Sequence, residues 1–139
     1  MYESETNTIA KERKAMITHL YPAKKSSPSI VFDDESNLFK VEGMSTLVNA
    51  VEFYNDAAQW ITLNESKLTA AVEFQFHLPY FNSASMKGIL LMMQRIKQGV
   101  DSGKQWTISW DVEDEDEFLL DAAESFQEML EMEIRIIRT

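Results

Sequence analysis

Few side chains in this 139-residue chain could act as a base, a nucleophile or a metal ligand. Only His19 and His77 are available as bases near neutral pH, and neither lies in a nucleophile, zinc or metalloprotease motif. The chain has no cysteine, which excludes disulfides, thiolate metal sites and a cysteine nucleophile. Its four glycines form neither GxGxxG nor a Walker-type loop. The sequence therefore shows no machinery for nucleotide-dependent catalysis, and we expect no cofactor or metal.

Carboxylates concentrate in the run Asp111–Glu117, which invites comparison with a calcium-binding loop. An EF-hand loop counted from its first residue would need Gly and Glu where Asp116 and Ala122 stand. Acidic side chains also suit the positive end of a helix dipole, so the run indicates a solvated helix entry. A small enzyme using Glu73, His77 or this run is an alternative, and it would require a pocket that gathers these groups with perturbed pKa values.

A second set of carboxylates repeats at helical spacing near the end of the chain. Residues 111–139 hold 11 acidic and 2 basic side chains, whereas residues 1–110 hold 12 and 11. An acidic third of the chain would repel phosphates, so nucleic acid is an unsuitable ligand. Four acids lie on one face of the expected helix and have no basic partner at i+4, so their charges repel one another. This face serves either for solubility or as a docking stripe for a basic surface on another protein. The four acids are Asp121, Glu124, Glu128 and Glu131.

Small polar residues mark a third candidate, where a strand ending at Leu78–Tyr80 gives way to a helix. Asn82, Ser83 and Ser85 are ordinary helix-capping residue types, and capping alone would explain them. A hydroxyl at a helix start is also a suitable phosphoacceptor, because backbone N–H groups and the helix dipole stabilise added phosphate charge. Both interpretations place the same side chains at one edge of a sheet.

The elements that must position these groups follow from hydrophobic periodicity. Alternating residues predict five strands, and apolar residues at helical spacing predict three helices, the first capped by Ser45. This alternation indicates an α/β fold with a mixed sheet: an antiparallel hairpin first, then parallel strands joined by right-handed crossovers, with one face partly wet. The expected strands are 30–33, 38–42, 68–78, 106–112 and 132–136, and the expected helices are 45–61, 86–100 and 118–130.

Length and composition indicate one domain, since 45% of the residues are hydrophobic and 139 residues suit a single core. Residues 1–21 lack a sustained period and are expected to form an N-terminal arm outside a domain of residues 22–139. No apolar run is long enough to cross a membrane, and the absence of cysteine fits a reducing compartment. We therefore expect a cytoplasmic protein without membrane insertion.

Three segments together match a known set of motifs. Residues 80–87 (YFNSASMK) are similar to the signature (Y/F)-(L/F)-N-(T/S)-S-S-x-K. Residues 27–33 (SPSIVFD) are similar to the opening motif (T/S)-P-x-I-x-(F/L)-D, and Phe53, Tyr54 and Trp60 fit a first-helix pattern. In these motifs the chain resembles the SiaC-type regulatory phosphoproteins, a bacterial family. The resemblance covers roughly residues 22–139. It implies a STAS-like single domain of order β-β-α-β-α-β-α-β with helices mainly on one face.

The resemblance also implies a function. Such proteins are non-enzymatic adaptors that, when unphosphorylated, bind and activate a GGDEF-type diguanylate cyclase, which makes cyclic-di-GMP. An anti-sigma-type Ser/Thr kinase switches them off and a PP2C-type phosphatase restores them. By position the phosphoacceptor is Ser83, with recognition by partner or kinase expected from Tyr80, Phe81, Asn82, Ser85 and Lys87. The alternative within switching modules is an anti-sigma-factor antagonist.

Overall fold

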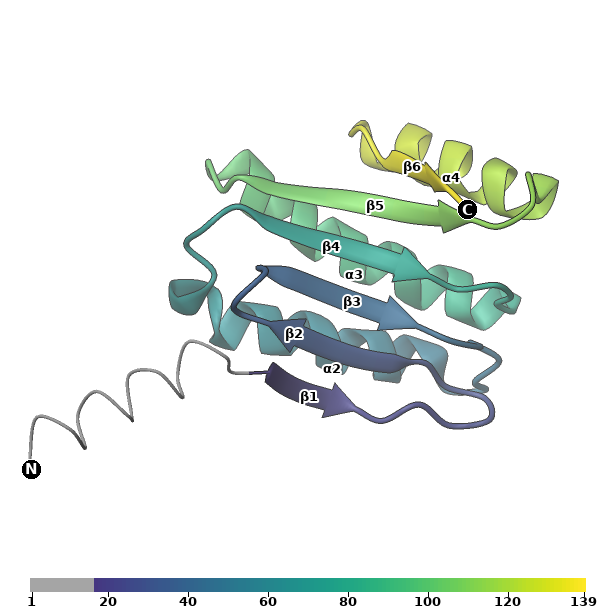
Figure 1. The fold of residues 1–139 in the computed structure, drawn as a ribbon, viewed down its shortest axis with the longest axis horizontal. Helices are drawn as coiled ribbons and strands as arrows, with labels where there is room; N and C mark the ends of the chain where they lie inside the picture. Colours follow the sequence, from purple (N-terminus) through teal and green to yellow (C-terminus); the bar gives the residue numbers. More distant parts are fainter. Residues whose placement is uncertain (1–16) are drawn as a thin grey trace, which may run out of the picture.

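A six-stranded sheet carries three helices on one of its faces (Figure 1). The structure, a computed structural model, describes residues 17–139. The strands are β1 (Ile17–Tyr21), β2 (Ser29–Asp33), β3 (Leu38–Glu42), β4 (Val72–His77), β5 (Trp106–Val112) and β6 (Arg135–Arg138). The helices are α2 (Ala50–Leu63), α3 (Ser83–Asp101) and α4 (Glu117–Leu130), with a short 3₁₀ turn, η1 (Glu65–Lys67).

Spatial order in the sheet follows sequence order, from β1 at one edge to β6 at the other. β2 and β3 form the predicted antiparallel hairpin, and β3, β4, β5 and β6 pair in parallel through helical crossovers. The predicted mixed α/β sheet is therefore confirmed. Parallel pairing brings the carboxyl ends of β3, β4 and β5 to one edge, the right-hand side of Figure 1.

The two faces of the sheet differ as the strand alternation predicts. One face lies under the helices, and its central row joins Val41, Phe76 and Trp110, all buried. On the other face, polar side chains such as Lys40, Gln75 and Ser109 occupy the next row. All three helices lie behind the sheet in Figure 1, so this second face is open.

The first difference from expectation is the strand β1. Residues 1–21 were expected to form an arm, but residues 17–21 pair antiparallel with β2 and make six strands instead of five. The pairing Ile17↔Asp33 begins the register, and a bulge falls between His19 and Tyr21. The alternation in β1 is short and half exposed, which is why periodicity missed it. The rest of the expected arm, residues 1–16, lies outside the described residues.

The second difference is the start of the first helix. Ser45 was predicted to cap it, but α2 begins at Ala50 with Asn49 in the capping position. Ser45 instead forms an isolated parallel bridge with Phe81, which extends the pairing of β3 and β4 beyond the strands. The Ser45 hydroxyl forms hydrogen bonds with the buried side chains of Tyr54 and Ser85, so it does not cap a helix.

Two strands are displaced or shortened. β4 begins at Val72 instead of Leu68, because the η1 turn occupies residues 65–67 and Leu68 donates its N–H to Glu65. β6 begins at Arg135 instead of Met132. Glu131 ends α4 in the left-handed conformation, and Ile134 N–H donates to the Gln127 side chain, so the chain folds back over α4 before it reaches β5.

A close crossing holds α2 against α3. Gly88 lies at this crossing, where an added Cβ would come within 2.6 Å of the Tyr54 ring and 2.8 Å of the Ala50 carbonyl oxygen. Only glycine allows this approach without a shift. The crossing fixes the position of the first turns of α3, and with them the candidate site.

Candidate functional site

Ser83 is the first residue of α3, at the carboxyl edge of the sheet. Asn82 has extended backbone (φ −89°, ψ 177°) and caps the helix, because its side-chain oxygen accepts from Ser85 N–H at 2.8 Å. The Asn82 amide also donates to the Leu47 carbonyl at 3.0 Å. Asn82 thus fixes the turn from both sides, and the Ser83 side chain is exposed.

Ser85 lies only two residues further on but is fully buried. Its hydroxyl donates to the Ser45 carbonyl at 2.8 Å and accepts from the Ser45 hydroxyl at 2.7 Å. Because the single hydroxyl proton of Ser45 goes to Ser85, the Tyr54 hydroxyl must be the donor in its 2.7 Å bond with Ser45. We call Ser45, Tyr54 and Ser85 the hydroxyl chain.

Tyr54 is suited to remain a donor in the hydroxyl chain. Burial raises the pKa of its phenol above the ordinary value, and the hydrogen bond with Ser45 opposes this only in part. Among residues 17–139 no buried side-chain nitrogen or oxygen lacks a hydrogen-bond partner. The hydroxyl chain is therefore satisfied at every member, which makes it a rigid link between the start of α3 and the segment before α2.

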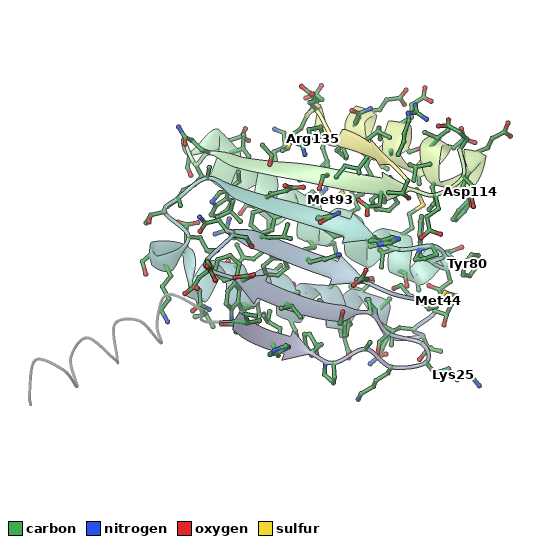
Figure 2. All side chains as sticks on the ribbon, in the orientation of Figure 1. Lys25, Met44, Tyr80, Met93, Asp114 and Arg135 are labelled. Carbon is green, nitrogen blue, oxygen red and sulfur yellow. The ribbon has the colours of Figure 1, made fainter. Side chains whose placement is uncertain are left out.

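Backbone bonds reinforce this link. Ser45 N–H donates to the Tyr80 carbonyl at 3.1 Å, and Asn82 N–H donates to the Ser45 carbonyl at 3.0 Å. Residues 44–49 and 80–83 thus form one structural unit, although about forty residues separate them in sequence. Figure 2 shows Met44 and Tyr80 beside each other at this edge.

Aromatic rings surround the exposed serine. A cavity of about 220 Å³ is lined by Ser83 and its neighbours, with Phe118 from the first turn of α4. Phe118 stacks on Tyr80 at 6.0 Å and contacts the Phe81 ring at 4.9 Å between centroids. Tyr80 and Phe118 are 48% and 47% exposed. Two large rings therefore face solvent beside the Ser83 hydroxyl.

The structure brings most of the predicted site residues together, in different surroundings. Tyr80, Asn82 and Ser83 line the cavity, and Lys87 is exposed one turn along α3. Phe81 also borders the cavity, but it is 3% exposed and packs edge-on against Trp110, so it supports the site from below. Ser85, expected to serve in recognition, lies in the core.

Of the four acids of the predicted docking stripe, here called the acidic stripe, Asp121, Glu124 and Glu128 lie on α4, and Glu131 follows its last residue in the left-handed conformation. All four carboxylates are exposed. Among residues 17–139, none of these four carboxylates takes part in an ion pair. Asp116 caps α4 by accepting from Phe118 and Leu119 N–H, which confirms the predicted helix entry. The stripe starts one turn after Phe118, so it adjoins the cavity.

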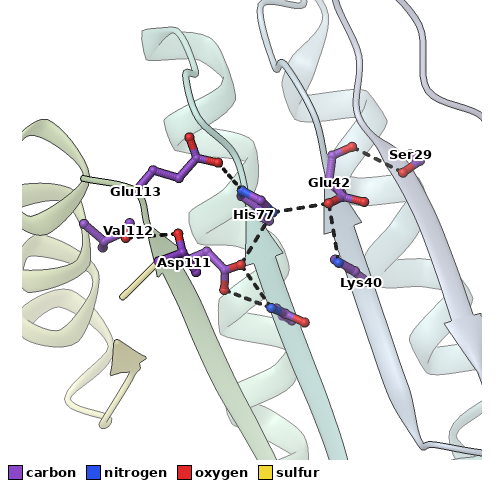
Figure 3. Close-up of polar contacts among 9 residues, drawn as sticks. Ser29, Lys40, Glu42, His77, Asp111, Val112 and Glu113 are labelled. Carbon is purple, nitrogen blue, oxygen red and sulfur yellow. Dashed lines mark hydrogen bonds and ion pairs between the residues drawn. The ribbon is translucent and has the colours of Figure 1, made fainter. Parts of the chain in front are cut away.

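The other polar cluster lies on the open face of the sheet (Figure 3). The His77 ring contacts Glu113 at 2.6 Å through Nε2 and Glu42 at 3.2 Å through Nδ1. Asp111 is buried and accepts from the Gln75 amide at 2.9 Å. Within the described part of the chain, no group of three or more His, Asp or Glu is arranged to hold a metal ion. Of the residues in the alternative enzyme site, His77 lies against Glu113, whereas Glu73 accepts from the Ser109 hydroxyl at 2.7 Å and contacts Arg135 at 3.8 Å.

Sequence reasoning missed the hydroxyl chain and Phe118. Ser45 carried a signal, a small hydroxyl residue shortly after a strand, but that signal predicts a helix cap. Phe118 is one of several apolar residues in the periodic pattern of α4, and nothing in the pattern distinguishes an exposed ring from a core ring. Within residues 17–139, no helix is both long and apolar enough to span a bilayer.

Fold and site together define a small mixed α/β domain that presents a capped helix with an exposed serine at its start. The sequence model of the SiaC family, described as SiaC family regulatory phosphoproteins, matches residues 21–139. The chain belongs to this family. An uncharacterised protein of Pseudomonas aeruginosa is 22% identical over 107 residues, which cover 77% of this chain and 85% of that relative.

Solved structures agree with this assignment. SiaC of Pseudomonas aeruginosa matches with a TM-score of 0.74 at 20% identity, over 89% of this chain and 99% of its own. The structure of the diguanylate cyclase SiaD in complex with its activator SiaC matches with a TM-score of 0.76, also at 20% identity, over 88% and 99%. These matches confirm the fold expected from the family resemblance.

Proposed function

We propose that this protein is a non-enzymatic adaptor that binds and activates a diguanylate cyclase while Ser83 is unphosphorylated. An anti-sigma-type kinase phosphorylates Ser83 and a PP2C-type phosphatase removes the phosphate. Family membership and the role of SiaC as activator of the diguanylate cyclase SiaD support the proposal. A partner of this kind would act in the cytoplasm.

The observation that carries the proposal is the contrast between two serines in one turn of helix. The Ser83 hydroxyl is exposed, whereas Ser85 is fully buried and both donates and accepts within the hydroxyl chain. A kinase must bring the acceptor oxygen to the γ-phosphate of its nucleotide, and this is possible at Ser83 without opening the core. The geometry thus favours Ser83 as the acceptor.

Phosphate on Ser83 would suit the domain itself. It would add about −1.5 to −2 charges at the amino end of a 19-residue helix, where the dipole favours anions. Lys87 is exposed one turn further along α3 and carries a compensating charge. The domain should therefore remain folded, and the phosphate should act on whatever binds the surface around Ser83.

The test is phosphorylation by the cognate kinase followed by mass spectrometry. We expect one phosphate on Ser83, and loss of the phosphorylated protein from the complex with its cyclase. Ser83→Ala should stay bound in the presence of kinase and ATP, while the matched variant Ser36→Ala, in an exposed turn, should be released like the natural chain. Phosphate on Ser85 alone, or on neither serine, would overturn the assignment of the acceptor.

A second experiment separates the cyclase adaptor from the anti-sigma-factor antagonist. Purified partners are mixed with the unphosphorylated chain, and complex formation is measured by size-exclusion chromatography. An adaptor stimulates cyclic-di-GMP synthesis by a GGDEF cyclase. An antagonist would instead hold an anti-sigma kinase as its terminal target and leave the cyclase unaffected.

A further inference from the structure

Large apolar side chains that face solvent gather at the carboxyl ends of the central strands. Four large apolar side chains there are 42% to 96% exposed. They come from three separate segments that meet at this edge: the loop before α2, the turn before α3 and the first turn of α4. We call them the apolar rim: Met44, Val48, Tyr80 and Phe118.

The apolar rim is held in place before any partner arrives. Tyr80 and Met44 flank the backbone bonds between Ser45 and the 80–82 turn, and the hydroxyl chain ties that turn to α2. Phe118 is fixed by Asp116, which caps α4, and by contact with the buried Phe81 ring. A surface built this way loses little conformational entropy on binding, which is the property of a preorganised docking site.

The charge next to the apolar rim indicates what binds there. Asp121, Glu124 and Glu128 follow Phe118 along α4 and have no ion-pair partner among residues 17–139. These carboxylates extend about 15 Å from the rim, at 1.5 Å per helical residue. Like charges in a row repel one another, and a basic partner would relieve that repulsion. An apolar cavity at one end and an unpaired acidic row beside it complement an apolar side chain followed by basic ones.

We infer that the apolar rim and the acidic stripe form one docking surface for a partner segment that carries a bulky apolar side chain followed by Lys or Arg. The apolar side chain enters the cavity between Ser83 and Phe118, and the basic side chains lie over α4. This inference rests on the proposed function, which supplies the partner: the segment belongs to the regulated cyclase. Phosphate on Ser83 would occupy the cavity and displace the apolar side chain.

A synthetic peptide tests this surface without kinase or cyclase. The probe is an acetylated helical peptide with one Phe and with Lys three, six and ten residues after it, so that its charges mirror the acidic row. The unphosphorylated full chain is titrated with it and followed by NMR amide shifts. We expect shifts confined to residues 44–49, 80–87 and 117–128. A peptide with Glu in place of Lys should produce none.

Two protein variants separate the contributions. Phe118→Ala should raise the dissociation constant of the peptide about thirtyfold, the loss typical of an aromatic hot-spot residue. The double variant Glu124→Lys with Glu128→Lys should weaken binding of the peptide, and its binding should no longer weaken as the salt concentration rises. The matched controls are Leu63→Ala, an 82% exposed apolar residue at the end of α2, and Asp34→Lys with Glu35→Lys in the β2–β3 turn. Both controls should bind like the natural chain.

Each outcome decides the question. No shifts at millimolar peptide, shifts at another surface, or equal binding of the acidic peptide would overturn the docking surface. The proposed function fails differently, by absence of phosphate on Ser83 or absence of cyclase activation. Since the peptide experiment uses neither kinase nor cyclase, its failure and that of the proposed function are distinguishable.

Discussion

The carboxyl edge around Ser83 and the open sheet face around His77 are both rich in polar side chains, but they are organised in opposite ways. At the edge, the hydroxyl chain buries its polar atoms in complete hydrogen bonding, and large rings are left exposed. On the open face, charged groups pair with one another in partial contact with water. Exposed rings beside unpaired charge, more than a concentration of polar groups, are the features on which the proposed docking surface rests.

The largest effect should come from placing a charge at the two serines of the site. Ser85→Asp puts a carboxylate into a fully buried position whose hydrogen-bond partners are the hydroxyl and carbonyl of Ser45 and which holds no positive charge, so it should lower the free energy of unfolding by about 3–5 kcal/mol. Ser83→Asp, the matched control, should change stability by no more than about 1 kcal/mol, because an acid suits a helix start. Urea denaturation of both variants measures the difference. Equal losses would contradict the separation of a buried anchor from an exposed acceptor.

A moderate effect is expected from removing one end of the hydroxyl chain. Tyr54→Phe deletes the donor to Ser45, and it should cost about 1–2 kcal/mol of stability. Amide hydrogen exchange at Ser85 and Met86 should become faster, because the start of α3 loses its link to α2. Tyr21→Phe is the control, since that hydroxyl makes only a 3.4 Å bond with Asp56 near the surface. Unchanged exchange in Tyr54→Phe would show that the chain does not hold the site.

The open face should tolerate change. Glu113→Gln removes the charge that faces His77 from a 45% exposed side chain, and it should cost less than about 1 kcal/mol. Partner binding should be unaffected. Thermal melting and the cyclase-binding assay check both statements. A loss of binding here would mean that the open face, and not the carboxyl edge, is the functional surface.

The smallest effect concerns an ion pair away from both regions. A hydrogen bond from Arg95 holds the pKa of Glu65 below its ordinary value of 4.5. A lowered folded-state pKa contributes stability above the unfolded value, and that contribution is lost as pH falls through the folded value. Glu65→Gln should therefore be slightly less stable than the natural chain at about pH 7, and this difference should shrink as the pH falls below the ordinary pKa of Glu65. Urea midpoints measure this, with Glu35→Gln as an exposed control; a difference that persists in acid would contradict the assignment.

Much of the fold could be predicted from the sequence because its signals are local. The alternation in β5 and the periodic apolar face of α4 each depend on a few neighbouring residues, and both elements have the predicted character. The start of α3 was predicted in part: Asn82 is a capping residue type, but the apolar stripe indicated a helix only from residue 86, three residues after its start at Ser83. Ser83 at the helix start follows from the same local pattern.

The remaining features depend on tertiary contacts that the local pattern does not show. Ser45 is read locally as a helix cap, but its partners are Tyr54 and Ser85, and only the crossing of α2 over α3 brings them together. β6 begins three residues later than its alternation indicates, since the Gln127 side chain holds Ile134 outside the sheet. In each case a tertiary hydrogen bond decides between two conformations that the local sequence allows equally.

The bridge between Ser45 and Phe81 has a consequence for the timing of the proposed phosphorylation of Ser83. The geometry of Ser83 is assembled from two stretches of chain that are joined only after β3, α2, β4 and α3 have come together. The site is thus a conformational epitope: a peptide of residues 80–87 contains every letter of the motif but lacks the Ser45 and Leu47 partners that shape it. A kinase that recognises this conformation would phosphorylate folded protein and not nascent or unfolded chains. Phosphorylation would then inactivate only adaptors that are able to bind a partner.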